Sequence, residues 1–114
     1  MTSEEFVDAL KEIIVEDGTR NLQTNLIKPP GRSPANELVQ MSKWYNALSD
    51  GDKLMLLKII SDALHGGLFE VLCILDGVSS IENGEKGKLK LYYEKAGKSI
   101  LLNDESKVML HDLL

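Results

Sequence analysis

The side chains of this 114-residue chain that could act as nucleophile and base are its one cysteine and its two histidines. Cys73 lies inside an apolar run, Val71–Leu75, where a thiol usually packs as a small apolar group. A reactive cysteine needs exposure and a nearby positive charge. His65 is the nearest partner along the chain, and a lone cysteine and histidine match no catalytic signature. We therefore predict that the protein is not an enzyme.

Two other patterns suggest metal or phosphate binding, and neither has the required spacing. A metal site could in principle combine His65 and His111 with the acidic residues Asp62, Asp104 and Asp112. No pair in this set has a known metal-ligand spacing. The segment 84–88, GEKGK, is shorter than a phosphate-binding loop and precedes an expected strand instead of a helix. We predict no catalytic residue, no metal site and no cofactor.

The elements that would position these residues centre on the stretch Asp50–Val78. Ser49 or Asp50 can cap a helix whose apolar residues recur every three to four positions up to Leu64. The pair Gly66-Gly67 is expected to end this helix, and a second, shorter helix follows up to Asp76-Gly77. A buried strand over Val71–Leu75 is the alternative, because a short apolar run does not reveal its period.

The N-terminal half is predicted to contain two helices with a long loop between them. The first helix begins at Ser3 and ends at Asp17-Gly18, and the segment 19–34, which holds all three prolines, is expected to be irregular. The second helix, Ala35–Leu48, follows Ser33-Pro34. Its residues expected to be buried are Leu38, Met41, Tyr45 and Leu48, with Val39 and Trp44 beside them.

The C-terminal part is predicted to form a β-hairpin and a short helix. Lys88–Glu94 alternates apolar and polar residues, and Ser99–Leu102 returns after a tight turn at Ala96-Gly97. Asn103 or Asp104 can cap a last helix that runs to Leu114. The predicted fold class is therefore α+β: a mainly helical single domain, residues 1–114, with a C-terminal β-hairpin followed by a short helix.

Composition narrows the function classes. The formal net charge of −5 argues against nucleic acid and anionic membranes as partners, and it permits a basic protein partner. No apolar run approaches the roughly 20 residues of a membrane span. The acidic segment Met1–Glu5 lacks the order of a signal peptide, and one cysteine cannot form an intrachain disulfide. We expect a cytoplasmic protein.

Three groups of residues are candidates for an interaction surface. Their members are the acids Glu5, Asp8 and Glu12, the aromatic Trp44, and the basic pair Lys88 and Lys90. For the acids a solvated helix face is the favoured interpretation, and for Trp44 the favoured interpretation is packing in the core. Lys88 and Lys90 are two of five lysines around the hairpin, where lysine also discourages strands from pairing with other chains.

The order of several short segments resembles a small bacterial protein family of unknown function. The segments are His65-Gly66-Gly67-Leu68-Phe69, Leu75-Asp76-Gly77-Val78, Ile81-Glu82, Leu89-Lys90-Leu91-Tyr92-Tyr93, Leu101-Leu102-Asn103-Asp104 and Leu110-His111-Asp112-Leu113. This resemblance implies no activity and no assigned site. Size and acidity also give a looser likeness to immunity proteins that neutralise bacterial toxins.

These observations favour a cytoplasmic bacterial protein that acts as a non-catalytic protein-interaction module, such as a toxin-neutralising, immunity-like protein. The alternative is a small-molecule-binding regulatory module with a pocket near Gly66-Gly67, where missing side chains allow close approach. The identity of the partner, the oligomeric state and the role of the segment 19–34 stay open in the sequence.

Overall fold

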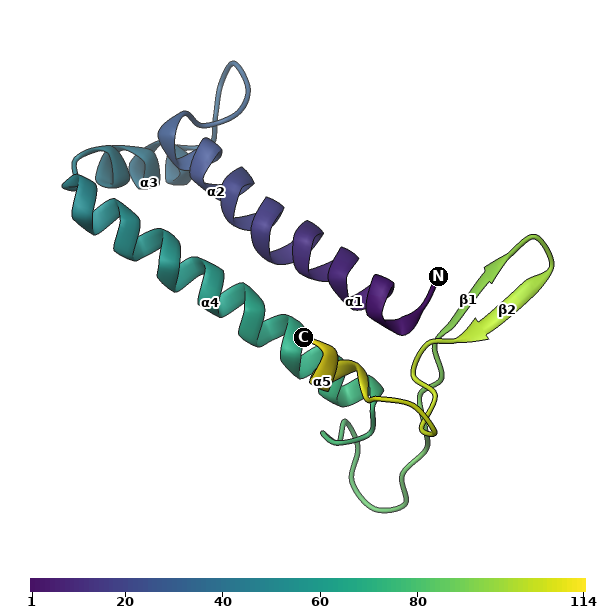
Figure 1. The fold of residues 1–114 in the computed structure, drawn as a ribbon. Helices are drawn as coiled ribbons and strands as arrows, with labels where there is room; N and C mark the ends of the chain where they lie inside the picture. Colours follow the sequence, from purple (N-terminus) through teal and green to yellow (C-terminus); the bar gives the residue numbers. More distant parts are fainter.

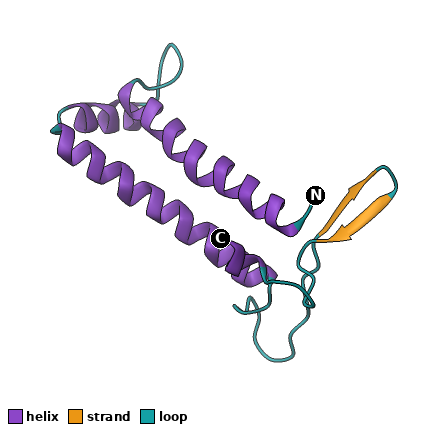
Figure 2. Cartoon of the chain, viewed as in Figure 1, coloured by secondary structure: helices purple, strands orange, loops and turns teal.

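Two long helical rods and a small hairpin make up the α+β fold that the sequence predicts. The computed structural model describes residues 1–114. Its elements are α1 (Ser3–Leu10), η1 (Lys11–Glu16), α2 (Asp17–Ile27), α3 (Asn36–Asn46), α4 (Asp50–Leu75), β1 (Tyr92–Lys95), β2 (Lys98–Leu101) and α5 (Leu110–Leu113). Figure 2 shows how the helices occupy the first two thirds of the chain and the two strands lie near its end.

The first rod is a continuous helix in which α1, the π-helical stretch η1 and α2 follow one another without a gap. Thr2 caps it, since its side chain accepts from the Glu5 amide while the Glu5 carboxylate accepts from the Thr2 amide. The prediction that the helix ends at Asp17-Gly18 is wrong. A Cβ at Gly18 would lie 3.3 Å from Leu64 Cδ1, so this glycine allows α4 to approach closely.

The irregular segment between the first two predicted helices is therefore shorter than expected. Thr19–Ile27 is helical, and only Lys28–Ala35 is irregular. Lys28 turns extended, with φ −143° and ψ 110°, because the proline that follows it disfavours helical geometry. Helix α3 then closes the end of α2: the Asn46 side chain donates to the Ile27 carbonyl at 3.0 Å.

Helix α3 forms as predicted, but it buries only part of its apolar face. Tyr45 is 2% exposed, whereas Trp44 is 57% exposed. Leu38 and Met41, which were expected to be buried, are 38% and 41% exposed. The placement of Trp44 in the core is wrong because α3 packs mainly on α2, which covers a single side of a short helix.

The central stretch is one 26-residue helix, α4, and the predicted break at Gly66-Gly67 is wrong. Ser49 caps it as expected, accepting from the Asp52 amide at 3.2 Å. Each glycine costs about 1 kcal/mol relative to alanine in a helix. Burial of Leu68 and Leu72 further along the same helix outweighs that local cost. Val71–Leu75 is thus helical, and the helix ends before Gly77, which has a φ of 76°.

The core lies at one end of the two rods, which run antiparallel (Figure 1). Its main cluster is formed by Val7, Val15, Leu68, Leu72 and Leu110, from η1 and helices α1, α4 and α5, while Leu26 and Tyr45 are buried where α2 meets α3. The radius of gyration is 18.5 Å, whereas a globular chain of this length has one of about 13 Å. The molecule is therefore elongated, and much of each rod has no neighbouring layer.

The hairpin stands beyond the end of the rods, on the opposite end from α3 (Figure 1). Tyr93 pairs with Ile100 in antiparallel register. Ala96 and Gly97 both have positive φ, 51° and 77°, as a two-residue hairpin turn with right-handed twist requires. The hairpin is confirmed, with the first strand shorter than the predicted Lys88–Glu94. No helix of the protein is long and apolar enough to cross a membrane.

Candidate functional site

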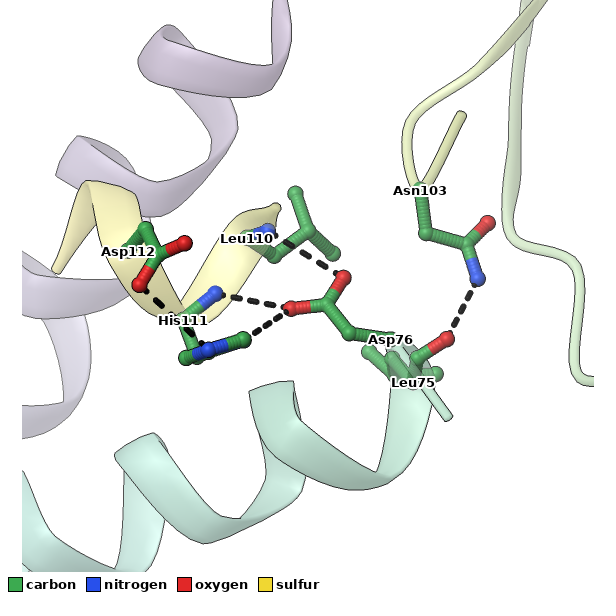
Figure 3. Close-up of polar contacts among 6 residues, drawn as sticks. All are labelled: Leu75, Asp76, Asn103, Leu110, His111 and Asp112. Carbon is green, nitrogen blue, oxygen red and sulfur yellow. Dashed lines mark hydrogen bonds and ion pairs between the residues drawn. The ribbon is translucent and has the colours of Figure 1, made fainter. Parts of the chain in front are cut away.

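The best-ordered polar cluster surrounds Asp76, the residue that ends α4. Its Oδ1 accepts from the Leu110 amide at 3.1 Å, and its Oδ2 accepts from the His111 amide at 2.9 Å. The side chain is 3% exposed. Asp76 therefore caps α5, although the two are more than 30 positions apart in the chain (Figure 3). The predicted cap at Asn103 or Asp104 is wrong, because α5 begins only at Leu110.

His111 completes this cluster with its imidazole ring. Nδ1 lies 2.7 Å from Asp76 Oδ2, and Nε2 lies 3.4 Å from Asp112 Oδ1. Phe69 meets the ring edge-on, with the centroids 5.7 Å apart. Both ring nitrogens thus face carboxylates, and the ring is 14% exposed. Nδ1 is therefore held by Asp76, whereas Nε2 has only the longer contact with the exposed side chain of Asp112.

Asn103 ties the same corner to the base of the hairpin. Its Nδ2 donates to the Leu75 carbonyl at 2.7 Å and to the Leu89 carbonyl at 2.8 Å. Its Oδ1 accepts from the Leu91 amide at 2.8 Å. An asparagine side chain can satisfy two carbonyls and one amide at once. We call Asp76, Asn103 and His111 the C-terminal junction; its contacts hold α4, α5 and the hairpin together (Figure 3).

Cys73 is buried in α4, as the sequence predicts. Burial raises the pKa of its thiol, and the negative charges of Glu70, Asp76 and Asp112 raise it further. A nucleophilic cysteine needs the opposite shift, toward the thiolate. His65 lies about 12 Å earlier along the helix axis. The geometry therefore does not bring the two into a nucleophile–base pair.

The five residues considered for metal binding are spread over the molecule. No group of three or more His, Cys, Asp or Glu side chains is placed to hold a metal ion. Among the five, His111 and Asp112 are in contact. His111 belongs to the C-terminal junction, and Asp112 lies beside it. Asp104 instead closes a local turn: the Ser106 amide and hydroxyl donate to its Oδ1 at 3.0 and 2.8 Å, which lowers the pKa of its carboxyl.

The predicted interaction residues lie on three separate parts of the molecule. Glu5, Asp8 and Glu12 are exposed on the first rod. Trp44 is exposed on α3, at the opposite end from the hairpin (Figure 1). Exposed Lys88 and Lys90 precede β1, and Lys88 forms an ion pair with Glu105 at 3.1 Å. These residues therefore do not form one continuous surface.

A hollow of about 650 Å³ lies past the C-terminal end of α4. Its walls come from the segments 74–82 and 86–90 and from Leu101, Asn103, Asp104 and Glu105. Neither Gly66 nor Gly67 lines it; both glycines lie on an exposed part of α4. Within it, the Gly87 amide donates to Glu82 Oε1 at 2.6 Å.

Comparison with known proteins found no family model that matches the chain, no curated protein similar to it and no matching solved structure. The resemblance to a small bacterial family and the looser one to immunity proteins therefore stay predictions.

Proposed function

We propose that this chain is a non-catalytic, cytoplasmic protein-interaction module, with the neutralisation of a toxin as one form that this activity can take. The observation that carries the proposal is the amount of surface left uncovered. The chain exposes 8237 Å², whereas a folded monomer of its mass exposes about 6,200 Å². The difference exceeds the roughly 800 Å² per partner that a standard protein interface covers.

The exposed surface is apolar at specific places, which supports a protein as the partner. On α3, Trp44 is 57% exposed, and Met41 and Leu38 are about two-fifths exposed three and six positions earlier. Tryptophan is enriched among the residues that dominate binding energy, and methionine adapts to irregular partner surfaces. We propose that α3 binds its partner through Trp44.

Charge supports a basic partner. The net charge is −5, and the exposed acids of the first rod include Glu5, Asp8 and Glu12. Complementary charge speeds the encounter of two proteins more than it strengthens the complex. We therefore expect association with the partner to become slower as salt concentration rises.

Cys73 and His111 have the side chains most suited to catalysis, and their surroundings favour a non-catalytic role. The pKa of Cys73 is raised, so its thiol stays protonated at neutral pH. Both nitrogens of His111 face carboxylates. A protonated thiol is a weak nucleophile, and Asp76 engages one nitrogen of His111, so both environments favour a non-catalytic role.

Affinity purification from an extract of the organism that encodes the chain tests this proposal. The parent chain should retain a basic protein in a stoichiometric amount, and Trp44→Ala should lose it. Tyr92→Ala is the matched control, because Tyr92 is also a half-exposed aromatic, 51%, but lies on the hairpin. Retention of the same partner by Trp44→Ala, or no stoichiometric partner on the parent, would contradict the proposal.

A further inference from the structure

The β-hairpin has a free strand edge that the rest of the chain does not cover. The sheet consists of β1 and β2 alone, and both strands stand beyond the end of the rods (Figure 1). A two-stranded hairpin is at best marginally stable by itself, and a third strand stabilises it. We propose that an extended, acidic segment of a partner protein pairs with the free edge of β1 as a third, antiparallel strand.

The hydrogen-bond pattern of the hairpin shows which backbone groups are free. The Leu102 amide donates to the Leu91 carbonyl at 2.8 Å, one step beyond the last residue pair of the two strands. Hydrogen-bonded and non-hydrogen-bonded pairs alternate along an antiparallel ladder. The amides and carbonyls of Tyr92 and Glu94 are therefore directed away from β2. Free groups of this kind at a sheet edge are what an added strand binds.

The charge of the hairpin is opposite to that of the rest of the chain. Residues 88–101 contain four lysines and one acid, a formal charge of +3; because the whole chain carries −5, the remaining residues carry −8. Lys88 is in an ion pair, whereas Lys90, Lys95 and Lys98 are exposed and form none. Unpaired lysines beside a free edge favour an acidic segment as the added strand.

Two of these lysines repel each other in the free protein. Lys95 and Lys98 are directly opposite in the ladder, where like charges are destabilising. Their neighbours on the same face are Tyr93 and Ile100, and Glu94 projects from the other face. A glutamate of an added strand that lies opposite Lys95 would project from the lysine face and relieve this repulsion. The pair of lysines is thus complementary to an anion that the hairpin itself does not supply.

The same lysines argue against a second copy of this chain as the occupant. Two β1 edges that paired would bring segments of like charge together, which is how edge lysines prevent self-association. Tyr92, which is 51% exposed on this edge, can pack on a β-branched side chain opposite it. An acidic strand that also contains threonine or valine therefore fits best.

The first experiment measures the binding of a synthetic probe to the full chain by fluorescence anisotropy. The probe is a labelled peptide of alternating threonine and glutamate, and its counterpart has lysine in place of glutamate. The acidic peptide should bind with a dissociation constant below about 1 mM, and the basic peptide should not bind. The affinity should fall as salt concentration rises, because the lysines are exposed. No binding of the acidic peptide in this range would overturn the proposal.

Two methylated probes separate strand pairing from attraction between charges. When the glutamates of the peptide lie beside Lys95, its threonine amides face Tyr92 and Glu94 and donate to β1. Methyl groups on the threonine nitrogens remove these bonds and should raise the dissociation constant at least about tenfold. Methyl groups on the glutamate nitrogens, which face away from β1, should leave it unchanged. Equal binding of the two methylated probes would mean that charge alone attracts the peptide, and the third strand would be wrong.

Substitutions on β1 should change the affinity in opposite directions. Lys95→Gln should raise the dissociation constant for the acidic peptide about twofold to fivefold, and Glu94→Gln should lower it by a similar factor. Lys58→Gln and Glu37→Gln make the same changes of net charge at exposed positions of α4 and α3, and they should leave the affinity unchanged. Equal effects of Lys58→Gln and Lys95→Gln would contradict a site on β1.

Hydrogen exchange of individual amides identifies the edge that is used. The amides of Tyr92 and Glu94 should exchange rapidly in the free chain, and saturating acidic peptide should slow both. The Ser99 amide, which belongs to the other free edge of the hairpin, should keep its rate. Protection of Ser99 with no change at Tyr92 and Glu94 would place the peptide on β2 and overturn the assignment to β1.

This site and the partner proposed for Trp44 can fail independently. Trp44→Ala should bind the acidic peptide as well as the parent chain does, whereas Tyr92→Ala should bind it less tightly. If the peptide does not bind and the parent chain still retains a basic protein through Trp44, this inference alone fails. If the peptide binds by strand pairing and no basic protein is retained, the proposed function fails instead.

Discussion

Asp76 and His111 are 35 positions apart in the chain, yet Oδ2 of one lies 2.7 Å from Nδ1 of the other. The same carboxylate also accepts from the His111 and Leu110 amides. One side chain therefore decides where α5 begins and which way the His111 ring faces. Because the Asp76 side chain is 3% exposed, these contacts are shielded from water.

Asp76→Asn should lower the free energy of unfolding by about 1–3 kcal/mol, since a buried charged acceptor of three bonds is replaced by a group with only one acceptor atom. Chemical denaturation with urea measures the change. Asp62→Asn is the control, because Asp62 is exposed on α4, and it should shift stability by less than about 0.5 kcal/mol. Equal effects of the two substitutions would mean that the cap does not stabilise the fold.

Asn103→Ala should loosen the base of the hairpin before it unfolds the rods. The substitution leaves the carbonyls of Leu75 and Leu89 and the amide of Leu91 without their partner. Each lost bond of this kind costs about 1 kcal/mol. Hydrogen exchange should show faster exchange at the Leu91 amide, while amides in the middle of α4 keep their protection. Uniform acceleration along the chain would show that Asn103 acts on global stability instead.

Gly18→Leu should destabilise the protein by about 1–3 kcal/mol, because the larger side chain would push Leu64 and α4 away from the first rod. Gly51→Leu introduces the same side chain where the added Cβ has open space and should be neutral or slightly stabilising. Thermal unfolding of both variants measures the difference. Similar midpoints for the two would contradict the close packing at Gly18.

Cys73 should react slowly with iodoacetamide in the folded protein at pH 7 and rapidly in urea, because burial and the neighbouring carboxylates raise the pKa of its thiol. A raised pKa means that the folded state binds the thiol proton more tightly than the unfolded state does. This contribution to stability is fully present below the ordinary thiol pKa of about 8.5 and is lost as pH rises above it. Cys73→Ala should remove that alkaline part of the pH dependence.

The features set by neighbouring residues were predictable from the sequence. Ser49 caps α4 and Ala96-Gly97 makes the hairpin turn, because each needs only local chemistry. Predictions failed at Gly18 and Gly66-Gly67, which were taken as helix ends, whereas the helix does end before Gly77 as predicted. Gly18 and Gly67 lie inside helices, because packing of other residues in the same helices can offset a local cost of about 1 kcal/mol.

The contacts of the C-terminal junction could not be predicted from the sequence, because they join residues that are far apart in the chain. Asp76 precedes a glycine, a pattern that predicts a turn. His111 lies in a short apolar segment. No spacing rule links two residues 35 positions apart, so only the folded chain brings them together. Neither residue carried a sequence signal that assigned it a role.

The core joins the two ends of the chain. Val7 and Leu110 belong to one buried cluster, and the Ser3 hydroxyl donates to the Leu102 carbonyl at 2.7 Å. Contacts between residues so far apart form late, because a long loop must close before they exist. During synthesis on the ribosome, η1 and α2 can therefore pack on α3 and α4 before α5 has emerged, whereas the part of α1 that contacts α5 stays uncovered until Leu110 is available. We expect this end of the core to form last.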